Sequence, residues 1–249
     1  MKKLLYIITG LAFAFSIGAC SMSEKSENGD TDADGQGGSL ARFTVKGDYL
    51  YTVDVSNLHT FNISDAQHPR KVDDEQLGVF TETIFPYENN LLLGTDNGMY
   101  VYSLENPAAP VFKSYFEHIV SCDPVVAQNN FAYITLNSAS TRCWNASNLL
   151  QIVDISNLSN PFMVKEYTMT SPLGLDIDND TLYVCDNGLT VYNVQNKMDM
   201  QLIKQFPEIE ATDVICLENS IIVIGAGGLH QYKFEGNNLV KLSSILVNQ

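Results

Sequence analysis

The chain has 249 residues, and its 29 acidic against 14 basic residues give a net charge of −15. Such an acidic surface repels phosphate backbones and anionic lipid headgroups, so we expect no nucleic-acid partner and no electrostatic membrane binding. The length suits one well-filled domain, and after Ile17 no apolar run is long enough to cross a membrane.

Residues 1–19 have the pattern of an export signal. Lys2 and Lys3 form a basic start, and residues 4–17 form an apolar stretch that is too short for an ordinary membrane span. The run Ile17-Gly18-Ala19-Cys20 resembles the bacterial lipobox, which implies cleavage before Cys20 and lipid attachment to it. We therefore expect a lipid anchor at Cys20, and the alternative is an ordinary signal peptide that contains a Cys.

Residues 20–39 are expected to form a flexible acidic linker behind the lipidated Cys, because Ser, Asp, Glu and Gly dominate and little can be buried. Glu24, Glu27 and Asp30 follow Cys20 closely. This spacing resembles the surface-export signal of Bacteroidetes-type lipoproteins. It implies an anchor in the bacterial outer membrane, with display at the cell surface favoured over a periplasmic orientation.

A unit of about forty residues recurs five times in residues 40–249, which we take as one domain. Its turn positions, taken as Asp48, Asn90, Asn130, Asp180 and Ser220, are 42, 40, 50 and 40 residues apart. In residues 171–209 the pattern predicts four short strands, at 173–177, 181–185, 189–194 and 201–206. A period of this size made only of strands indicates an all-β fold, a β-propeller of about five four-stranded antiparallel blades.

Residues 149–161, which read LLQIVDISNLSNP, resemble the LVIVD repeat, a blade type of bacterial surface propellers. Residues 61–69 and 102–110 are looser copies, while the fourth and fifth repeats lack the Pro. The resemblance implies a β-propeller and says little about activity, since such folds carry many functions.

Five Asp residues are expected at one end of the blades. In a propeller blade, the segment before the first strand and the turn after the second strand lie at the same end. Asp54, Asp96 and Asp186 follow second strands, and Asp123 and Asp213 precede first strands. Their carboxylates could hold Ca²⁺, a cationic ligand or a basic peptide. Alternatively, each accepts hydrogen bonds from backbone N–H groups of its own turn, so the metal remains open.

The third repeat is longer than its neighbours, and the extra residues fall at 137–148, at this same end. A loop that exceeds the repeat is a common place for binding. Trp144, the only Trp, could stack on a sugar, anchor a partner or pack beneath its own loop.

Two cysteines of this repeat are expected to form a disulfide. Cys122 precedes the first strand and Cys143 lies in the long loop, so both reach the same end, and an exported protein retains disulfides. Cys185 and Cys216 are left open, with buried thiols as the simple alternative.

No catalytic motif is present, and we assign no catalytic residue. His118, near Asp123, is the one His placed for acid–base work. We expect a membrane-anchored binding or scaffolding module for an envelope protein or glycan, acting through the Asp-rich end and the 137–148 loop, with no cofactor other than the Ca²⁺ considered above. The alternatives are a hydrolase or lyase that uses these carboxylates, with or without Ca²⁺, and a purely structural envelope component.

Overall fold

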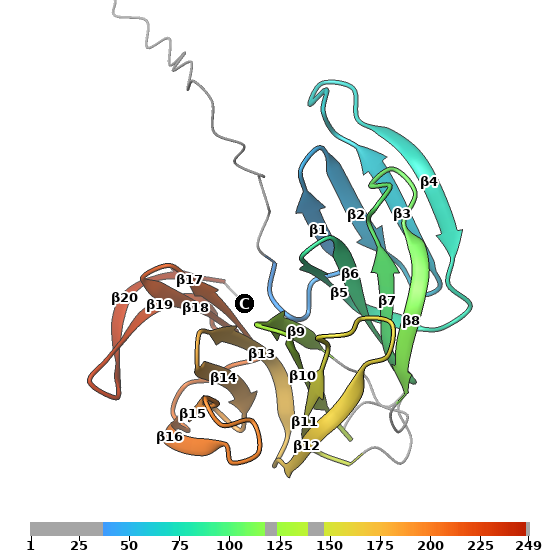
Figure 1. Cartoon of the computed structure of the whole chain (residues 1–249). Helices are drawn as coiled ribbons and strands as arrows, with labels where there is room; N and C mark the ends of the chain where they lie inside the picture. Colours follow the sequence, from blue (N-terminus) through green and yellow to red (C-terminus); the bar gives the residue numbers. More distant parts are fainter. Residues whose placement is uncertain (1–36, 118–123, 139–146, 248–249) are drawn as a thin grey trace, which may run out of the picture. The chain divides into compact units, whose positions relative to one another are not determined.

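The computed structural model describes residues 37–117, 124–138 and 147–247. Within these residues, twenty strands form five four-stranded sheets, and in each sheet the strands are neighbours in chain order and pair antiparallel (Figure 1). The chain is therefore a five-bladed β-propeller, as the repeat pattern predicts. The described part of the chain has no helix that is long and apolar enough to cross a membrane.

We number the blades in chain order. Blade one contains β1 (Phe43–Lys46), β2 (Tyr49–Val53), β3 (Asn57–Asn62) and β4 (Arg70–Gln76). Blade two contains β5 (Thr81–Tyr87), β6 (Asn90–Thr95), β7 (Gly98–Ser103) and β8 (Val111–Glu117). Blade three contains β9 (Val125–Gln128), β10 (Phe131–Leu136), β11 (Leu149–Asp154) and β12 (Phe162–Thr168). Blade four contains β13 (Pro172–Asp178), β14 (Thr181–Asp186), β15 (Leu189–Asn193) and β16 (Gln201–Phe206). Blade five contains β17 (Asp213–Leu217), β18 (Ser220–Gly225), β19 (Gly228–Glu235) and β20 (Asn238–Leu246).

The first two strands of every blade are joined by a two-residue turn. Most of these turns use residues that tolerate positive φ, such as Gly47 at 55° and Asn179 at 54°. The strand register corrects the expected turn positions by one residue in two blades, because Tyr87 pairs with Asn90 and Leu217 pairs with Ser220. The equivalent turn residues are therefore Asn89 and Asn219, and sequence alone could not choose between the adjacent Asn89 and Asn90.

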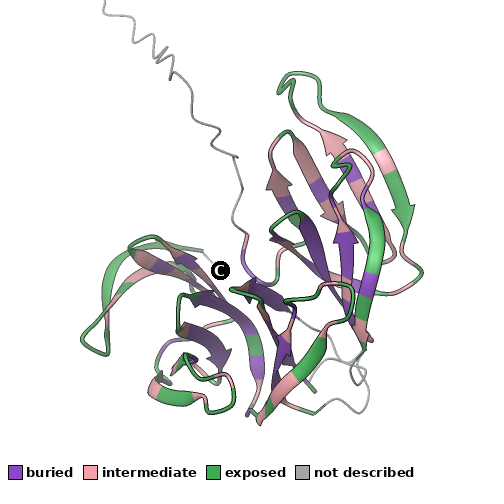
Figure 2. Ribbon diagram, viewed as in Figure 1, coloured by how far each residue is buried: buried purple, intermediate pink, exposed green. Residues whose placement is uncertain are grey.

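Hydrophobic clusters fill the junctions between consecutive blades. Alternate residues of a strand point to opposite faces, so Leu91 and Leu93 of β6 face blade one while Leu92 faces blade three. Four such clusters join blades one to two, two to three, three to four and four to five. Burial follows this arrangement, with buried inner strands and exposed outer strands such as β4 and β20 (Figure 2).

The segment just before β1, which we call the lead-in segment (residues 37–42), is part of the folded domain. Gly38 and Ser39 are buried, although the sequence places them at the end of the flexible linker. The Ala41 carbonyl accepts a hydrogen bond from the Ile84 N–H at 3.0 Å, which ties this segment to β5.

Candidate functional site

We call the end of each blade at which its first strand begins and its second strand ends the entry end. Four of the predicted carboxylates lie there: Asp54 follows β2, Asp96 follows β6, Asp186 ends β14 and Asp213 begins β17. The other predicted site residues, Asp123, Trp144, Cys122 and Cys143, lie outside the described residues, as does His118.

The exposed Asp54 carboxylate is held by its own turn. Its Oδ1 accepts hydrogen bonds from the backbone N–H groups of Ser56 at 2.9 Å and Asn57 at 2.8 Å. Its Oδ2 lies 3.1 Å from Nε2 of His59, whose Nδ1 lies 2.7 Å from Oδ1 of Asp74. The Ser56 N–H and then the His59 ring hold the pKa of Asp54 well below its ordinary value. At Asp54 the structure therefore shows the alternative in which the carboxylate accepts hydrogen bonds from its own turn.

The Asp186 carboxylate is buried and serves the neighbouring backbone. It accepts hydrogen bonds from the N–H groups of Thr170 at 3.1 Å and Ser171 at 2.5 Å, which lead into β13 of the same blade. A buried carboxylate with these donors stabilises the local chain path.

Asp96 is half-buried and stands one residue beyond the position that Asp54 and Asp186 occupy. The corrected register puts Thr95 at that position, and its hydroxyl donates to the Gly98 carbonyl at 2.7 Å. The repeat therefore does not carry an Asp at the same place in every blade.

Asp213 and Asp176 are two buried carboxylates of blades five and four that influence each other electrostatically. Asp213 accepts hydrogen bonds from Ser39 Oγ at 2.9 Å and from the Leu40 N–H at 3.3 Å. Ser39 Oγ in turn accepts from the Leu175 N–H at 2.8 Å. Asp176 accepts from the Cys216 N–H at 2.7 Å, so this carboxylate joins blade four to blade five.

Burial is the main reason why the pKa values of Asp176 and Asp213 are raised. It raises the pKa of Asp176 to about 7, and the nearby Asp213 carboxylate adds to the shift. Burial likewise raises the pKa of Asp213, against the hydrogen bonds from Ser39 and Leu40 that favour its charged form. Sequence reasoning missed Ser39 because this residue lies at the end of the polar linker.

The described carboxylates of the entry end do not converge on one point. Among the residues that the structure describes, no three His, Cys, Asp or Glu side chains lie close enough to hold a metal ion. Glu82, also at this end, pairs with Arg42 at 3.1 Å. Cys185 and Cys216 are both buried thiols in the cluster between blades four and five.

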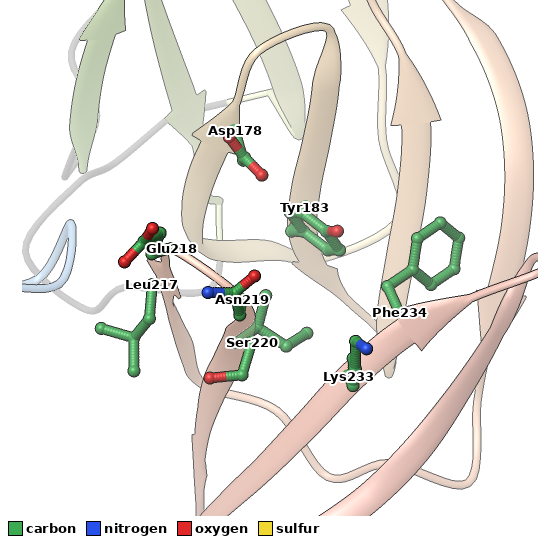
Figure 3. A pocket seen from close by; sticks show the side chains of 9 residues that line it. Asp178, Tyr183, Leu217, Glu218, Asn219, Ser220, Lys233 and Phe234 are labelled. Carbon is green, nitrogen blue, oxygen red and sulfur yellow. The ribbon is translucent and has the colours of Figure 1, made fainter.

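An open pocket lies at the opposite end of the blades, between blades four and five. It encloses about 460 Å³, counted with the space open to solvent. Its side chains come from the ends of β13 and β17, from the turn after β17, and from β14, β18 and β19 (Figure 3). They include Asp178, Glu218, Asn219 and Lys233, beside an edge-to-face pair of Tyr183 and Phe234 with ring centres 6.0 Å apart. The sequence did not single out this pocket, since its residues come from two repeats.

Comparison with known proteins bears on the repeat unit and on the fold. Residues 37–72 and 143–169 match the model of the LVIVD repeat. Two segments of the chain therefore match the LVIVD repeat. The second match contains the 149–161 segment on which the resemblance rests, and the first contains the looser copy at 61–69. No curated protein matches this chain.

Solved structures that resemble this chain share its fold at low sequence identity. A protein from Lactobacillus plantarum superposes with a TM-score of 0.65 at 12% identity, covering 79% of this chain and 67% of that one. A putative 6-phosphogluconolactonase from Bacteroides fragilis gives 0.63 at 10% identity, covering 83% and 70%. One from Bacteroides uniformis gives 0.63 at 10% identity, covering 86% and 70%. At such identities the likeness establishes the fold alone.

The buried Asp176 predicts an inverted pH dependence of stability. Its folded pKa of about 7 exceeds its ordinary 3.8, so between these values the folded state holds a proton that the unfolded state has lost. Asp176 therefore contributes stability that is fully present below pH 3.8 and is lost as the pH rises through about 7. The loss should reach about 4 kcal/mol at most.

The measurement is urea unfolding between pH 4 and 8, with the native chain compared with Asp176→Asn. The free energy of unfolding of the native chain should fall relative to the variant across this range, on top of a constant offset. Asp178→Asn, an exposed change on the same strand, should keep the native slope. Parallel curves for the native chain and Asp176→Asn would contradict the assignment.

Proposed function

We propose that this protein is a lipid-anchored binding or scaffolding module of the cell envelope, which engages a protein or glycan partner at the entry end. The observation that carries the proposal is the fixed base of the 137–148 loop at that end. The Ser138 N–H and hydroxyl both donate to Asn148 Oδ1, at 2.9 and 3.0 Å. Asn148 Nδ2 donates to the Thr170 carbonyl at 2.5 Å, and Asn137 Nδ2 donates to the Pro172 carbonyl at 2.6 Å.

A long loop whose two ends are tied to each other and to the chain before β13 is suited to recognition. Its ends lose little conformational freedom on binding, because they are already fixed. The exposed Asp54 and the half-buried Asp96 belong to the same end, so blades one and two give that end an acidic rim. A partner with basic or hydroxyl-rich groups fits this rim better than an anionic one.

The roles of three described carboxylates give no support to catalysis. Asp54, Asp186 and Asp213 each accept hydrogen bonds from backbone N–H groups, which commits their oxygens to the fold. A general acid or base needs a carboxyl oxygen that can reach a substrate proton. The sequence-based hydrolase or lyase alternative therefore gains no support from these three residues.

The export signal and Cys20 support the envelope location. A lipid attached to Cys20 would hold the blades at the outer membrane through the acidic linker, without a membrane span. An anchored module of this kind meets envelope proteins and glycans, and its net charge of −15 disfavours direct contact with anionic headgroups.

Cross-linked capture from intact cells tests the binding role. The full lipidated chain should retain a protein or glycan partner, and the double variant Asp96→Asn with Trp144→Ala should lose most of that capture, by about tenfold or more if the two residues form part of a hot spot. Asp199→Asn, an exposed Asp at the opposite end of blade four, makes the same charge change as a control and should capture as the native chain does. Equal capture by all three proteins would remove the entry end as the binding surface.

Cell fractionation tests the anchor. The native chain should be found with the outer membrane, whereas Cys20→Ala should lose its lipid and leave the membrane fraction, since one residue carries the attachment. Mass spectrometry of the N-terminal peptide should show acyl chains on Cys20. A Cys20→Ala protein that stays in the outer membrane would contradict a lipid anchor at this site.

A further inference from the structure

Five blades are joined by four hydrophobic junctions, so one face of blade one and one face of blade five have no cluster of their own among the described residues. Each junction pairs the face that one blade turns toward its successor with the face that the next blade turns toward its predecessor. Blade five keeps a successor-type face and blade one keeps a predecessor-type face.

The free face of blade five carries apolar residues beside the polar Gln231, which pairs with Ile222. The strand register places Ile215 opposite Ile222, and Ile224 opposite Leu229, on the side away from blade four. Leu229 of blade five and Leu189 of blade four occupy equivalent positions, because each pairs with the next-to-last residue of the second strand of its blade. Leu189 is 0% exposed at the junction with blade five, whereas Leu229 is 37% exposed.

The free face of blade one is apolar in part, because Thr52 and His59 stand beside its apolar residues. Val45, Leu50 and Phe61 lie opposite one another across β1, β2 and β3, and Phe43 points to the same side. Phe43 of blade one and Ile84 of blade two occupy equivalent positions, because each stands three residues before the end of the first strand of its blade. Ile84 is 2% exposed at the junction between blades one and two, whereas Phe43 is 58% exposed.

The lead-in segment covers the inner part of the blade-five face. A Cβ on Gly38 would lie 3.2 Å from Cγ1 of Ile215, and Ser39 and Leu40 bond Asp213. The outer part, on β18 and β19, keeps Leu229 exposed. The two free faces are thus separated at their inner edges by the chain's own residues and do not cover each other.

We propose that a second copy of this chain docks here, with the blade-five face of one copy on the blade-one face of another. The contact would continue the stacking that the four internal junctions already use, with the same two kinds of face. Such a contact is heterologous, because it joins two different patches of identical chains. The proposal does not depend on the partner bound at the entry end.

Complementary variants of the full chain in detergent test this proposal by sedimentation velocity. The native chain should sediment as a dimer or larger assembly. Phe43→Lys damages only the blade-one face and Leu229→Glu damages only the blade-five face, so each variant alone should be monomeric. A mixture of the two should dimerise, because each mixed pair retains one undamaged contact. Phe162→Lys, an exposed change on the outer strand of blade three, should assemble like the native chain.

Both substitutions replace exposed residues, and recovery of assembly on mixing also shows that both variants are folded. Circular dichroism of each variant checks the fold independently. A native chain that remains monomeric at all concentrations would overturn the proposal. A mixture that stays monomeric while the native chain assembles would overturn it as well, since assembly would then use other surfaces.

Discussion

The buried carboxylate of Asp213 receives the Ser39 hydroxyl at 2.9 Å and the Leu40 N–H at 3.3 Å, and so joins the start of the last blade to the segment that precedes the first. Ser39 extends the contact to the Leu175 N–H of blade four. A Cβ on Gly38 would lie 2.1 Å from Asp213 Oδ2, so this approach requires a glycine. Because no hydrophobic cluster joins blades five and one among the described residues, these hydrogen bonds connect the two ends of the repeat array. A buried carboxylate that loses such donors destabilises the folded state, so the fold depends on these hydrogen bonds.

The same residue type serves three structural purposes in this fold. Asp54 closes an exposed turn, Asp186 supports the chain that enters β13, and Asp213 binds the lead-in segment. The hydrogen bonds of these entry-end carboxylates therefore stabilise local geometry and do not by themselves indicate a ligand. The recognition role proposed for this end depends more on the fixed base of the 137–148 loop and on the acidic rim than on any shared ligand site.

Local pattern was sufficient to predict the blades, because alternating apolar residues and turns rich in Asn, Asp and Gly determine each hairpin within a few residues. It failed by one residue at Asn90 and Ser220, where the strand register decides which residues form the turn. The bond between Ser39 and Asp213 spans 174 positions and depends on how the sheets pack, so no spacing in the sequence announces it. Sequence likewise identified the entry-end carboxylates by position but could not tell which oxygens the backbone already uses. The strand register likewise shows that Thr95, and not Asp96, is equivalent to Asp54 and Asp186.

Residue-resolved hydrogen exchange of the full chain tests the central claim, that the lead-in segment is bound to the last two blades. The amides of Leu40 and Leu175 should exchange slowly in the native protein, since they donate to Asp213 and to Ser39. Ser39→Ala should accelerate both, while the amide of Leu182, deep in blade four, should remain protected. Fast exchange at Leu40 and Leu175 in the native chain would contradict the account.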